Sequence, residues 1–444
     1  MAIETTPATG AFSTPAWSGH TRGSSEYRRL LTALFFAGIA TFAQLYSPQA
    51  ALPLVAAELR IPAATSALLI SSSTIGLAIG VIPWSLVADR AGRVRSMSIA
   101  VTAATIIGLL VPFAPTFGLL LAGRFVEGLM IGGVPAIAIA YLSEEIDPHH
   151  AARAAGTYVA GTTIGGLLGR LVAGSLAELT TWRVGVFVVA ALCAVASALF
   201  VGLAPVPRGF VPRRGLRSPS IEGGIARLLA VNLRSPRLLA LYAQGFLLMG
   251  GFVALYNYLA FRLASPPFDV PPTLVSLVFV TYLAGTWSAA QAGALAARFG
   301  RRPVLLLAIA VMIAGILLTL IPEVIPVLIG LVIATAGFFA AHAVASGWTA
   351  SEATIGRAQA SSLYNLAYYA GSSLFGWLGG VIFEAAGWGG TAGVIVGLAV
   401  LAAALAMLLL TDARATRRSV LIEPVEISTG SISDLPTCST GRST

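Results

Sequence analysis

The sequence contains little charge and no lysine. Charged residues make up 10% of its 444 residues, whereas hydrophobic residues make up 57%. A soluble domain carries roughly 25% charged residues, so this chain has too few polar groups to cover a globular surface. We therefore expect the lipid bilayer to be part of its solvent. The net charge of +9 comes from arginines that gather in turns rather than on one amphipathic face, which does not indicate nucleic-acid binding.

Cysteine and histidine are also scarce. We expect no disulfide between Cys193, in an apolar run, and Cys438, near the C-terminus, and the four histidines form no metal-ligand spacing with them. We therefore expect no metal and no other cofactor. The sequence offers no nucleophile–base pair and no GxxxxGKS/T phosphate loop, so it predicts neither an enzyme nor an ATP-driven protein. No apolar core precedes Leu30, which argues against a secretory signal.

Twelve apolar runs are long enough, or nearly so, to cross a hydrocarbon core of about 30 Å at 1.5 Å per residue. Helices are expected because lipid offers the backbone no hydrogen bonds and the runs show no period-2 alternation. The runs lie at roughly 30–53, 65–88, 96–114, 117–142, 153–177 and 182–203, then 236–262, 272–296, 303–321, 324–348, 356–383 and 388–411. The predicted fold is an all-α membrane protein of twelve transmembrane helices in two six-helix bundles, 28–203 and 236–411.

The remaining segments are polar. Residues 1–27 and 412–444 are typical of disordered tails, and 204–235 form a linker in which 221–231 are expected to make a short interfacial helix with Arg227 on its wet side. Of the 27 arginines, 22 lie on the side of the membrane that holds both termini and the linker. Three lie opposite, namely Arg60, Arg183 and Arg262. The positive-inside rule therefore predicts that both termini and the linker are cytoplasmic.

A short basic turn occurs twice. Asp89-Arg-Ala-Gly-Arg93 follows the second run, and Ala297-Arg-Phe-Gly-Arg301 follows the eighth, about 208 residues later. A second set of residues repeats at a spacing of 206: Gly165, Gly174, Glu178 and Trp182 correspond to Gly371, Gly380, Glu384 and Trp388. The two halves are therefore predicted to be parallel repeats that rock against each other about a central site.

The first copy of the turn resembles a known signature, G-x-x-x-D-R-x-G-R-K/R, at Asp89, Arg90, Gly92 and Arg93, and departs from it at Ser85 and Val94. Run four carries Arg124-Phe-Val-Glu127-Gly128, similar to R-x-x-Q/E-G. With its twelve runs, the chain resembles the major facilitator superfamily over about residues 28–411. Stretches 46–53, 246–257 and 360–369 resemble a narrower group, the bacterial inner-membrane proteins of the YnfM type. The resemblance implies a multi-pass transporter of the bacterial inner membrane, of an efflux-like kind.

The resemblance also implies a conformational latch made by Asp89, Arg90, Gly92 and Arg93. In such proteins the aspartate contacts the N-terminus of span eleven, which starts here near Gly356. Backbone N–H groups and the helix dipole favour negative charge at that place. The contact would close the cytoplasmic side in the outward-open state. Ala297 replaces the aspartate in the second copy, so we expect the reciprocal latch to be absent.

Ionisable residues within a span are expensive and functional by default, at roughly 2.5–3.5 kcal/mol each on insertion scales. Arg124 and Glu127 are three residues apart, so they share a helix face and pair with each other. Glu127 is the candidate proton carrier, with Arg124 as its partner, because burial favours the neutral carboxyl and the arginine favours the charged one. The alternative is that the pair only joins span four to span one, for instance at Gln44.

Arg170 stands where related antiporters carry a glycine-rich motif with proline. At 1.5 Å per residue, Arg124 lies about 10 Å from the outer edge and Arg170 about 25 Å from the cytoplasmic edge. We therefore expect one polar layer just outside the midplane, suited to a carboxylate or other small organic anion, since arginine offers a fixed charge and a donor fork. The predicted substrate-binding residues are Arg170, Arg124, Gln44, Tyr256, Asn257, Tyr368 and Tyr369. Simple interhelical packing is the alternative for the tyrosines of span eleven.

These features predict a secondary transporter that moves a small organic solute by alternating access, coupled to protons and directed outward. We expect it to act as a monomer in the bilayer. One alternative is a proton-coupled importer of a small organic anion. A non-transporting sensor is a further alternative, against which the costly charges inside the spans argue.

Overall fold

The first half of the chain is a series of helices with short connections. The computed structural model describes residues 17–210 and 224–411, and the regular elements within these two stretches are all helical. In chain order the first-half elements are α1 (Ser25–Tyr46), η1 (Ser47–Ala51), α2 (Leu52–Leu59), α3 (Ala63–Ala91), α4 (Arg93–Leu110), η2 (Val111–Phe113), α5 (Phe117–Ile131), α6 (Pro135–Glu145), α7 (Pro148–Leu179) and α8 (Trp182–Leu203).

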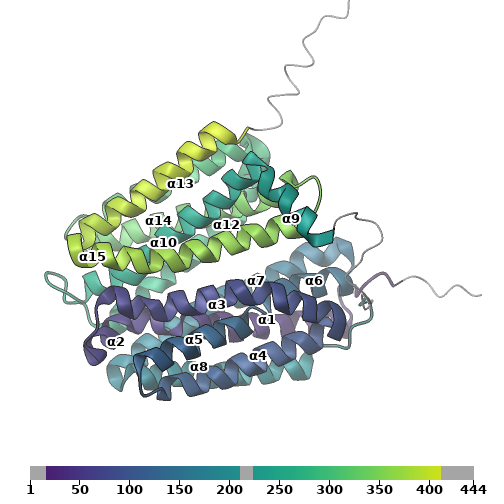
Figure 1. The fold of residues 1–444 in the computed structure, drawn as a ribbon, viewed down its shortest axis with the longest axis horizontal. Helices are drawn as coiled ribbons and strands as arrows, with labels where there is room; N and C mark the ends of the chain where they lie inside the picture. Colours follow the sequence, from purple (N-terminus) through teal and green to yellow (C-terminus); the bar gives the residue numbers. More distant parts are fainter. Residues whose placement is uncertain (1–16, 211–223, 412–444) are drawn as a thin grey trace, which may run out of the picture. The chain divides into compact units, whose positions relative to one another are not determined.

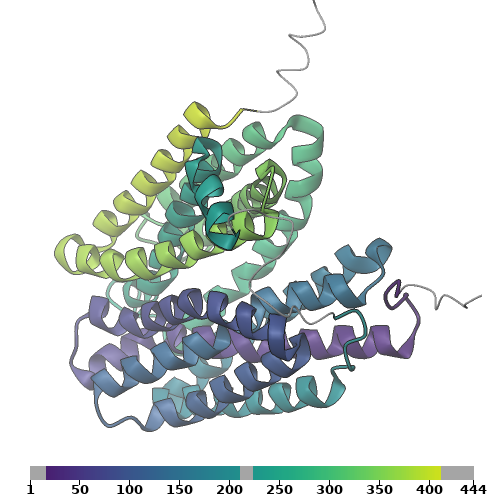
Figure 2. The same cartoon turned by 45° about the vertical axis from the view of Figure 1, so that its right-hand side comes forward.

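The second half begins with a short helix from the linker, α9 (Gly224–Arg234). It continues with α10 (Pro236–Leu263), α11 (Pro272–Ser276), η3 (Leu277–Thr281), α12 (Tyr282–Phe299), α13 (Arg301–Leu318), α14 (Val324–Glu352) and α15 (Arg357–Leu409). Within this half α10 runs beside α15, as Figure 1 shows and Figure 2 shows from a second angle.

The predicted membrane crossings are present in the described chain. Ten of its helical stretches are long and apolar enough to cross a membrane. One of them, within α15, holds two crossings, because Gly387 interrupts the helical backbone with φ 63° and ψ −161°. The fourth expected span was predicted as one helix, but it is divided at Gly132–Val134 into α5 and α6, which have 15 and 11 residues. Twelve crossings are thereby accounted for, and the predicted all-α membrane fold is confirmed.

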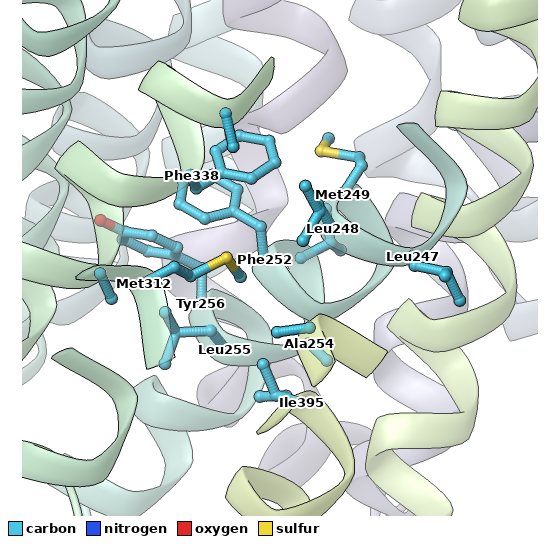
Figure 3. Close-up of a cluster of buried hydrophobic side chains, with 14 of the residues drawn as sticks. Leu247, Leu248, Met249, Phe252, Ala254, Leu255, Tyr256, Met312, Phe338 and Ile395 are labelled. Carbon is cyan, nitrogen blue, oxygen red and sulfur yellow. The ribbon is translucent and has the colours of Figure 1, made fainter. Parts of the chain in front are cut away.

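Helix α10 carries much of the apolar core of the second half. Most of its residues from Leu238 onward are buried, so the helix is enclosed on all sides rather than packed along one face. Phe252 stacks on Phe338 of α14 with ring centroids 3.9 Å apart and an interplanar angle of 10°. Figure 3 shows this pair beside Tyr256, Met249 and Met312. Described residues up to Leu410 form one compact unit, and the division into two bundles stays a prediction.

Parts of the predicted tail and linker are packed on α6. Trp17 Nε1 donates to the Glu144 carbonyl at 3.1 Å, and the His20 amide donates to the Glu145 carbonyl at 2.7 Å. The Glu145 carboxylate accepts the amides of Arg208 and Gly209 at 2.8 and 2.7 Å. The last part of the segment predicted as a disordered tail is therefore held in place. The predictions for residues 1–16, 211–223 and 412–444 concern parts of the chain outside the described residues.

Candidate functional site

The Arg124–Glu127 pair is buried within the first half, as the spacing predicts. Both residues are 1% exposed, and Arg124 Nη1 donates to Glu127 Oε2 at 2.7 Å. The other guanidinium donors reach backbone carbonyls of neighbouring spans. Nη1 and Nη2 donate to the carbonyls of Gln44 at 3.1 Å and Leu45 at 2.6 Å, and Nε donates to that of Leu69 at 3.3 Å. These contacts agree with the alternative interpretation, in which the pair only joins span four to its neighbours, because they connect span four with spans one and two.

Gln44 lies beside the same carboxylate. Its Nε2 donates to the Ala40 carbonyl at 2.8 Å and to Thr105 Oγ1 at 3.3 Å, which fixes the amide orientation. Its Oε1 is buried and has no hydrogen-bond partner in the described structure. A Cβ placed on Gly108 would lie 2.5 Å from this Oε1 and 2.9 Å from Glu127 Oε1. Two acceptor oxygens therefore face one small space that glycine leaves open.

Arg170 belongs to a separate network. Its Nε donates to Gln49 Oε1 at 2.7 Å, its Nη1 to the Gly166 carbonyl at 2.6 Å, and its Nη2 to the Tyr282 hydroxyl at 3.4 Å. The guanidinium carbon lies 4.2 to 4.9 Å from the ring centroids of Tyr46, Phe279 and Tyr282. Such cation–π contacts stabilise a buried arginine. In this state the side chain is enclosed rather than open to a cavity.

The Arg170 network connects the two halves of the chain. Gln49 Nε2 donates to Asn257 Oδ1 at 2.7 Å, and Asn257 Nδ2 donates to the Gly376 carbonyl at 3.4 Å. A continuous line of polar contacts therefore runs from α7 through η1 to α10 and α15. Asn257, one of the predicted substrate-binding residues, lies in this line.

Tyr256 faces a different direction, into the aromatic core. Its hydroxyl bonds with Thr281 Oγ1 at 2.5 Å and Thr335 Oγ1 at 2.7 Å, and its ring stacks on Phe279 with centroids 5.2 Å apart. The hydroxyl is therefore satisfied by neighbouring spans of the second half.

The tyrosines of span eleven meet the histidine of span ten. The Tyr368 ring lies 4.8 Å from that of His342 and stands at 90° to that of Tyr369. His342 Nδ1 lies 2.9 Å from the Tyr364 hydroxyl. This aromatic group is built from α14 and α15, and these contacts leave both alternatives for the tyrosines open.

The expected single polar layer is thus two networks. Gln44 lies in α1 and Gln49, five residues later, in the 3-10 segment η1, so their side chains point to different neighbours. Gln44 faces Arg124 and α4, whereas Gln49 faces Arg170 and the second half. Depth along a span predicts the level of a residue, but the helical phase decides which neighbours it meets. The assignments of substrate-binding and proton-coupling residues stay predictions.

The signature turn forms a charge cluster within its own half. Arg93 Nη1 donates to Asp89 Oδ1 at 2.6 Å, and its Nε and Nη2 form a fork with the Glu144 carboxylate at 2.8 to 3.2 Å. Gly356, expected beside Asp89, instead presents its carbonyl to Asn232 Nδ2 of α9 at 3.3 Å. The latch to span eleven is therefore not made in this state, and it stays a prediction for another state.

Polar contacts between the halves gather toward one end of α3. Ser71 Oγ donates to the Ser373 carbonyl at 2.9 Å, and Thr74 Oγ1 lies 2.7 Å from Ser373 Oγ. At 1.5 Å per residue, Thr74 lies about 16 Å from the start of α3 and Asp89 about 39 Å. We call the end of the molecule that holds Glu178 and Glu384 the glutamate end, and the end that holds Asp89 the arginine end. The described inter-half bonds that α3 makes lie in its part toward the glutamate end.

Sequence reasoning missed several residues of these networks, namely Tyr46, Gln49, Ser71, Thr74, Phe279, Tyr282 and Ser373. Gln49 had a signal, because it is a second amide in the first span and follows Pro48. The serines and threonines had none, since such residues often bond to their own helix.

Comparison with known proteins identifies the family. The model of the Major Facilitator Superfamily matches residues 34–265 and 263–426. The inner membrane transport protein YnfM of Escherichia coli is 38% identical over 381 residues, which cover 86% of this chain and 90% of that protein. The MFS-type transporter YybF of Bacillus subtilis is 35% identical over 374 residues, covering 84% and 91%.

Solved structures share the fold. A bacterial homologue of the human lysosomal transporter Spinster, in an inward-facing and occupied conformation, superposes with a TM-score of 0.71 at 18% identity and covers 87% of this chain and 97% of that chain. The xylose transporter XylE from E. coli, in a partially occluded inward-open conformation, gives 0.69 at 16%, covering 88% and 99%. With its twelve crossings and its multi-pass inner-membrane relative, the chain belongs to the Major Facilitator Superfamily of membrane transporters and is not an enzyme.

Proposed function

We propose that the chain exports a small organic solute by alternating access, in exchange for protons that Glu127 carries. The observation that carries the proposal is the environment of this buried carboxyl. Arg124 bonds to Oε2 and stabilises the charged form. The unpartnered Oε1 of Gln44 and Glu127 Oε1 face the same space beside Gly108, so a protonated carboxyl that turns toward Gln44 would supply the missing donor. In this proposal each protonation state has a partner.

Direction and sidedness are part of the same proposal. A relative named a chloramphenicol efflux pump, from Mycobacterium tuberculosis, is 26% identical over 48% of this chain, which supports outward transport. The arginine bias supports cytoplasmic termini and a cytoplasmic arginine end. The halves are joined toward the glutamate end, so the structure would then be an inward-facing state. We expect the transporter to act as a monomer.

Arg170 favours a second candidate, a proton-coupled importer of an organic anion. Its described partners are hydrogen-bond acceptors and aromatic rings, and no carboxylate pairs with it among the described residues. A fixed positive charge between the halves would attract an anionic cargo once the halves separate.

The first experiment identifies a cargo. Purified protein is screened by thermal shift against organic acids, sugars and drugs including chloramphenicol, since a bound cargo stabilises the fold by mass action. A preference for organic acids that is lost in Arg170→Gln supports the importer of anions. A preference for uncharged drugs or sugars supports export of a neutral solute and leaves Arg170 outside the binding site.

The second experiment tests proton coupling. The stabilising cargo is followed in proteoliposomes, with and without a pH gradient, for the wild type and Glu127→Gln. We expect Glu127→Gln to keep exchange of labelled for unlabelled cargo and to lose transport driven by the pH gradient. The exchange assay is the control for folding and cargo binding. Gradient-driven transport at the wild-type rate in Glu127→Gln would overturn the assignment of Glu127.

A further inference from the structure

Two helices of the glutamate end begin with a proline where the capping residue should stand. Pro62 is the N-cap of α3 and Pro271 is the N-cap of α11, and neither supplies a side-chain hydrogen bond. The amide groups of a first helical turn need an acceptor, which the N-cap side chain usually provides. Other spans follow that rule, since α5, α7, α8 and α10 are capped by Thr116, Asp147, Thr181 and Ser235.

In both helices the acceptor comes from the opposite half of the chain. Glu384 Oε1 accepts the amide of Ala64 at 2.8 Å, and Glu178 Oε2 accepts the amide of Thr273 at 2.6 Å. Each amide belongs to the second residue after the N-cap proline. At the start of α3, which has 29 residues, the carboxylate also interacts favourably with the helix dipole. The two bonds therefore exist only while the halves meet at this end.

A glycine four residues before each glutamate lets the opposing helix approach. A Cβ on Gly380 would lie 2.5 Å from Ala64 Cα, and a Cβ on Gly174 would lie 2.7 Å from Ser276 Cβ. The two glycines and the two glutamates correspond between the repeats at a spacing of 206. The same Gly-x-x-x-Glu unit therefore ends span five and span eleven, and each copy meets the other half in the same way.

We propose that Glu178 and Glu384 are positioning residues for transport, which together hold the glutamate end closed by capping helices of the opposite half. Both carboxylates are exposed to solvent and neither is part of the buried networks of Arg124 and Arg170. Opening this end breaks both caps at once, so the pair sets the population of the state that is open there. The inference rests on the alternating-access part of the proposed function and is independent of cargo and of proton coupling.

The test measures the population of the open glutamate end. Spin labels are placed at Ala57→Cys and Ser265→Cys, exposed positions of the two halves, in full-length protein with Cys438→Ser, reconstituted in lipid nanodiscs. The distance distribution is recorded by pulsed EPR. We expect Glu178→Ala and Glu384→Ala each to raise the open population about threefold to tenfold relative to the closed one, as loss of a helix cap would. In the double variant the two factors should multiply.

Two controls separate this role from a general effect of charge or folding. Glu323→Ala removes an exposed carboxylate that caps no helix of the opposite half, and it should leave the distance distribution unchanged. Glu384→Gln keeps an acceptor oxygen, so it should shift the distribution less than Glu384→Ala. A role in folding alone would lower the melting temperature without moving the populations.

The outcomes are distinct for the two proposals. A distribution that is the same in the wild type and the double alanine variant overturns the capping proposal. If every variant shows both a short and a long label distance in unchanged proportions, the capping proposal is overturned, but alternating access is supported. Loss of proton-driven transport in Glu127→Gln is a separate measurement and moves neither of these results.

Discussion

The two repeats are alike at the glutamate end and different at the arginine end. At the glutamate end, Glu178 and Glu384 each cap a helix of the opposite half. At the arginine end, Asp89 in the first turn corresponds to Ala297 in the second. Both turns keep the same backbone, since Gly92 and Gly300 have φ values of 96° and 97°. The two halves therefore share the shape of the turn and the caps of the glutamate end, but not the charge that the turn presents.

The described contacts around the two turns also differ. Arg93 joins Asp89 to Glu144 in the first half. In the second half, Arg301 donates to Ser351 Oγ at 2.6 Å, and Glu352 accepts instead from Trp348 Nε1 at 3.1 Å and from Arg237 at 3.2 Å. A cavity of about 260 Å³ beside Ala297 is lined by Arg301, Trp348 and small residues. The first half thus joins Asp89, Arg93 and Glu144 in one charge cluster, whereas the second half has a cavity beside Ala297, where the aspartate would stand.

The halves also differ inside the membrane. Gly123 and Gly330 correspond at a spacing of 207. At this spacing Leu331 and Ala334 are the second-half equivalents of Arg124 and Glu127. Both of these second-half residues are fully buried. The first half therefore holds an ion pair at a place where the second half is apolar, which is consistent with a function specific to one half.

The largest expected effect comes from breaking this ion pair on one side. Arg124→Leu leaves Glu127 buried without its cation and should reduce stability by about 3–5 kcal/mol. The double variant Arg124→Leu/Glu127→Ala copies the second half and should recover most of that loss, because it removes both charges. Thermal and denaturant unfolding in detergent measure the difference. Equal losses in the single and double variants would show that the pair is held by its backbone contacts alone.

A somewhat smaller effect is expected from crowding the glutamate end. Gly380→Ala places a Cβ against the start of α3 and should raise the population open at that end by about tenfold or more, since overpacking costs roughly 1–3 kcal/mol. Gly174→Ala should act in the same direction, because it is the equivalent position. Gly397→Ala, where a Cβ meets nothing within 4 Å, is the control. The label distances at Ala57 and Ser265 report the result, and a shift in one glycine variant alone would break the symmetry.

A modest effect is expected from the aspartate of the arginine end. Asp89→Asn removes the charge that the predicted latch needs, and it should favour the state open at the arginine end by about twofold to fivefold, as a surface helix-dipole contact would. Accessibility of a cysteine at Thr354, an exposed position just before span eleven, measures the shift. If Thr354→Cys is labelled at the same rate with and without Asp89→Asn, Asp89 does not act as a latch.

The smallest effect is expected from restoring the missing charge. Ala297→Asp gives Arg301 a carboxylate four residues away, as Asp89 gives Arg93. The site borders the cavity, so the side chain fits, but an exposed ion pair contributes only about 0–1 kcal/mol. We expect a slightly raised melting temperature. A marked fall would show that the apolar cavity is needed in another state.

Much of the fold could be predicted from the sequence, because length and hydropathy decide which segments cross a bilayer. The twelve crossings, the linker helix and the repeat all follow from such patterns. Run length alone treated the fourth span as one segment, although Gly132-Gly133 followed by Pro135 is a sequence that interrupts helices. The start of α1 follows from a local cap, because the Ser24 side chain accepts the Tyr27 amide, and apolar run lengths do not record such a cap. The packing of Trp17 depends on Glu144 of α6, far along the chain, which no local pattern records.

The site was harder to predict for a physical reason. Spacing gave the Arg124–Glu127 pair correctly because both residues lie on one helix. The partners of Arg170 lie on α1, η1, η3 and α12, so they depend on how four elements turn toward one another. The repeat of Glu178 and Glu384 was visible in the sequence, but its meaning was not. Only the proline N-caps of α3 and α11, seen together with the cross-half bonds, assign those carboxylates a role.

The most direct test of the account records both ends in matched samples. One sample carries labels at Ala57→Cys and Ser265→Cys for the glutamate end, and the other at Ala91→Cys and Thr354→Cys for the arginine end. Each is measured by pulsed EPR with and without Glu178→Ala/Glu384→Ala. We predict that the double variant raises the population with long distances at the glutamate end. The population with short distances at the arginine end should rise by the same amount. Opening at the glutamate end with no change at the arginine end would contradict alternating access between the two.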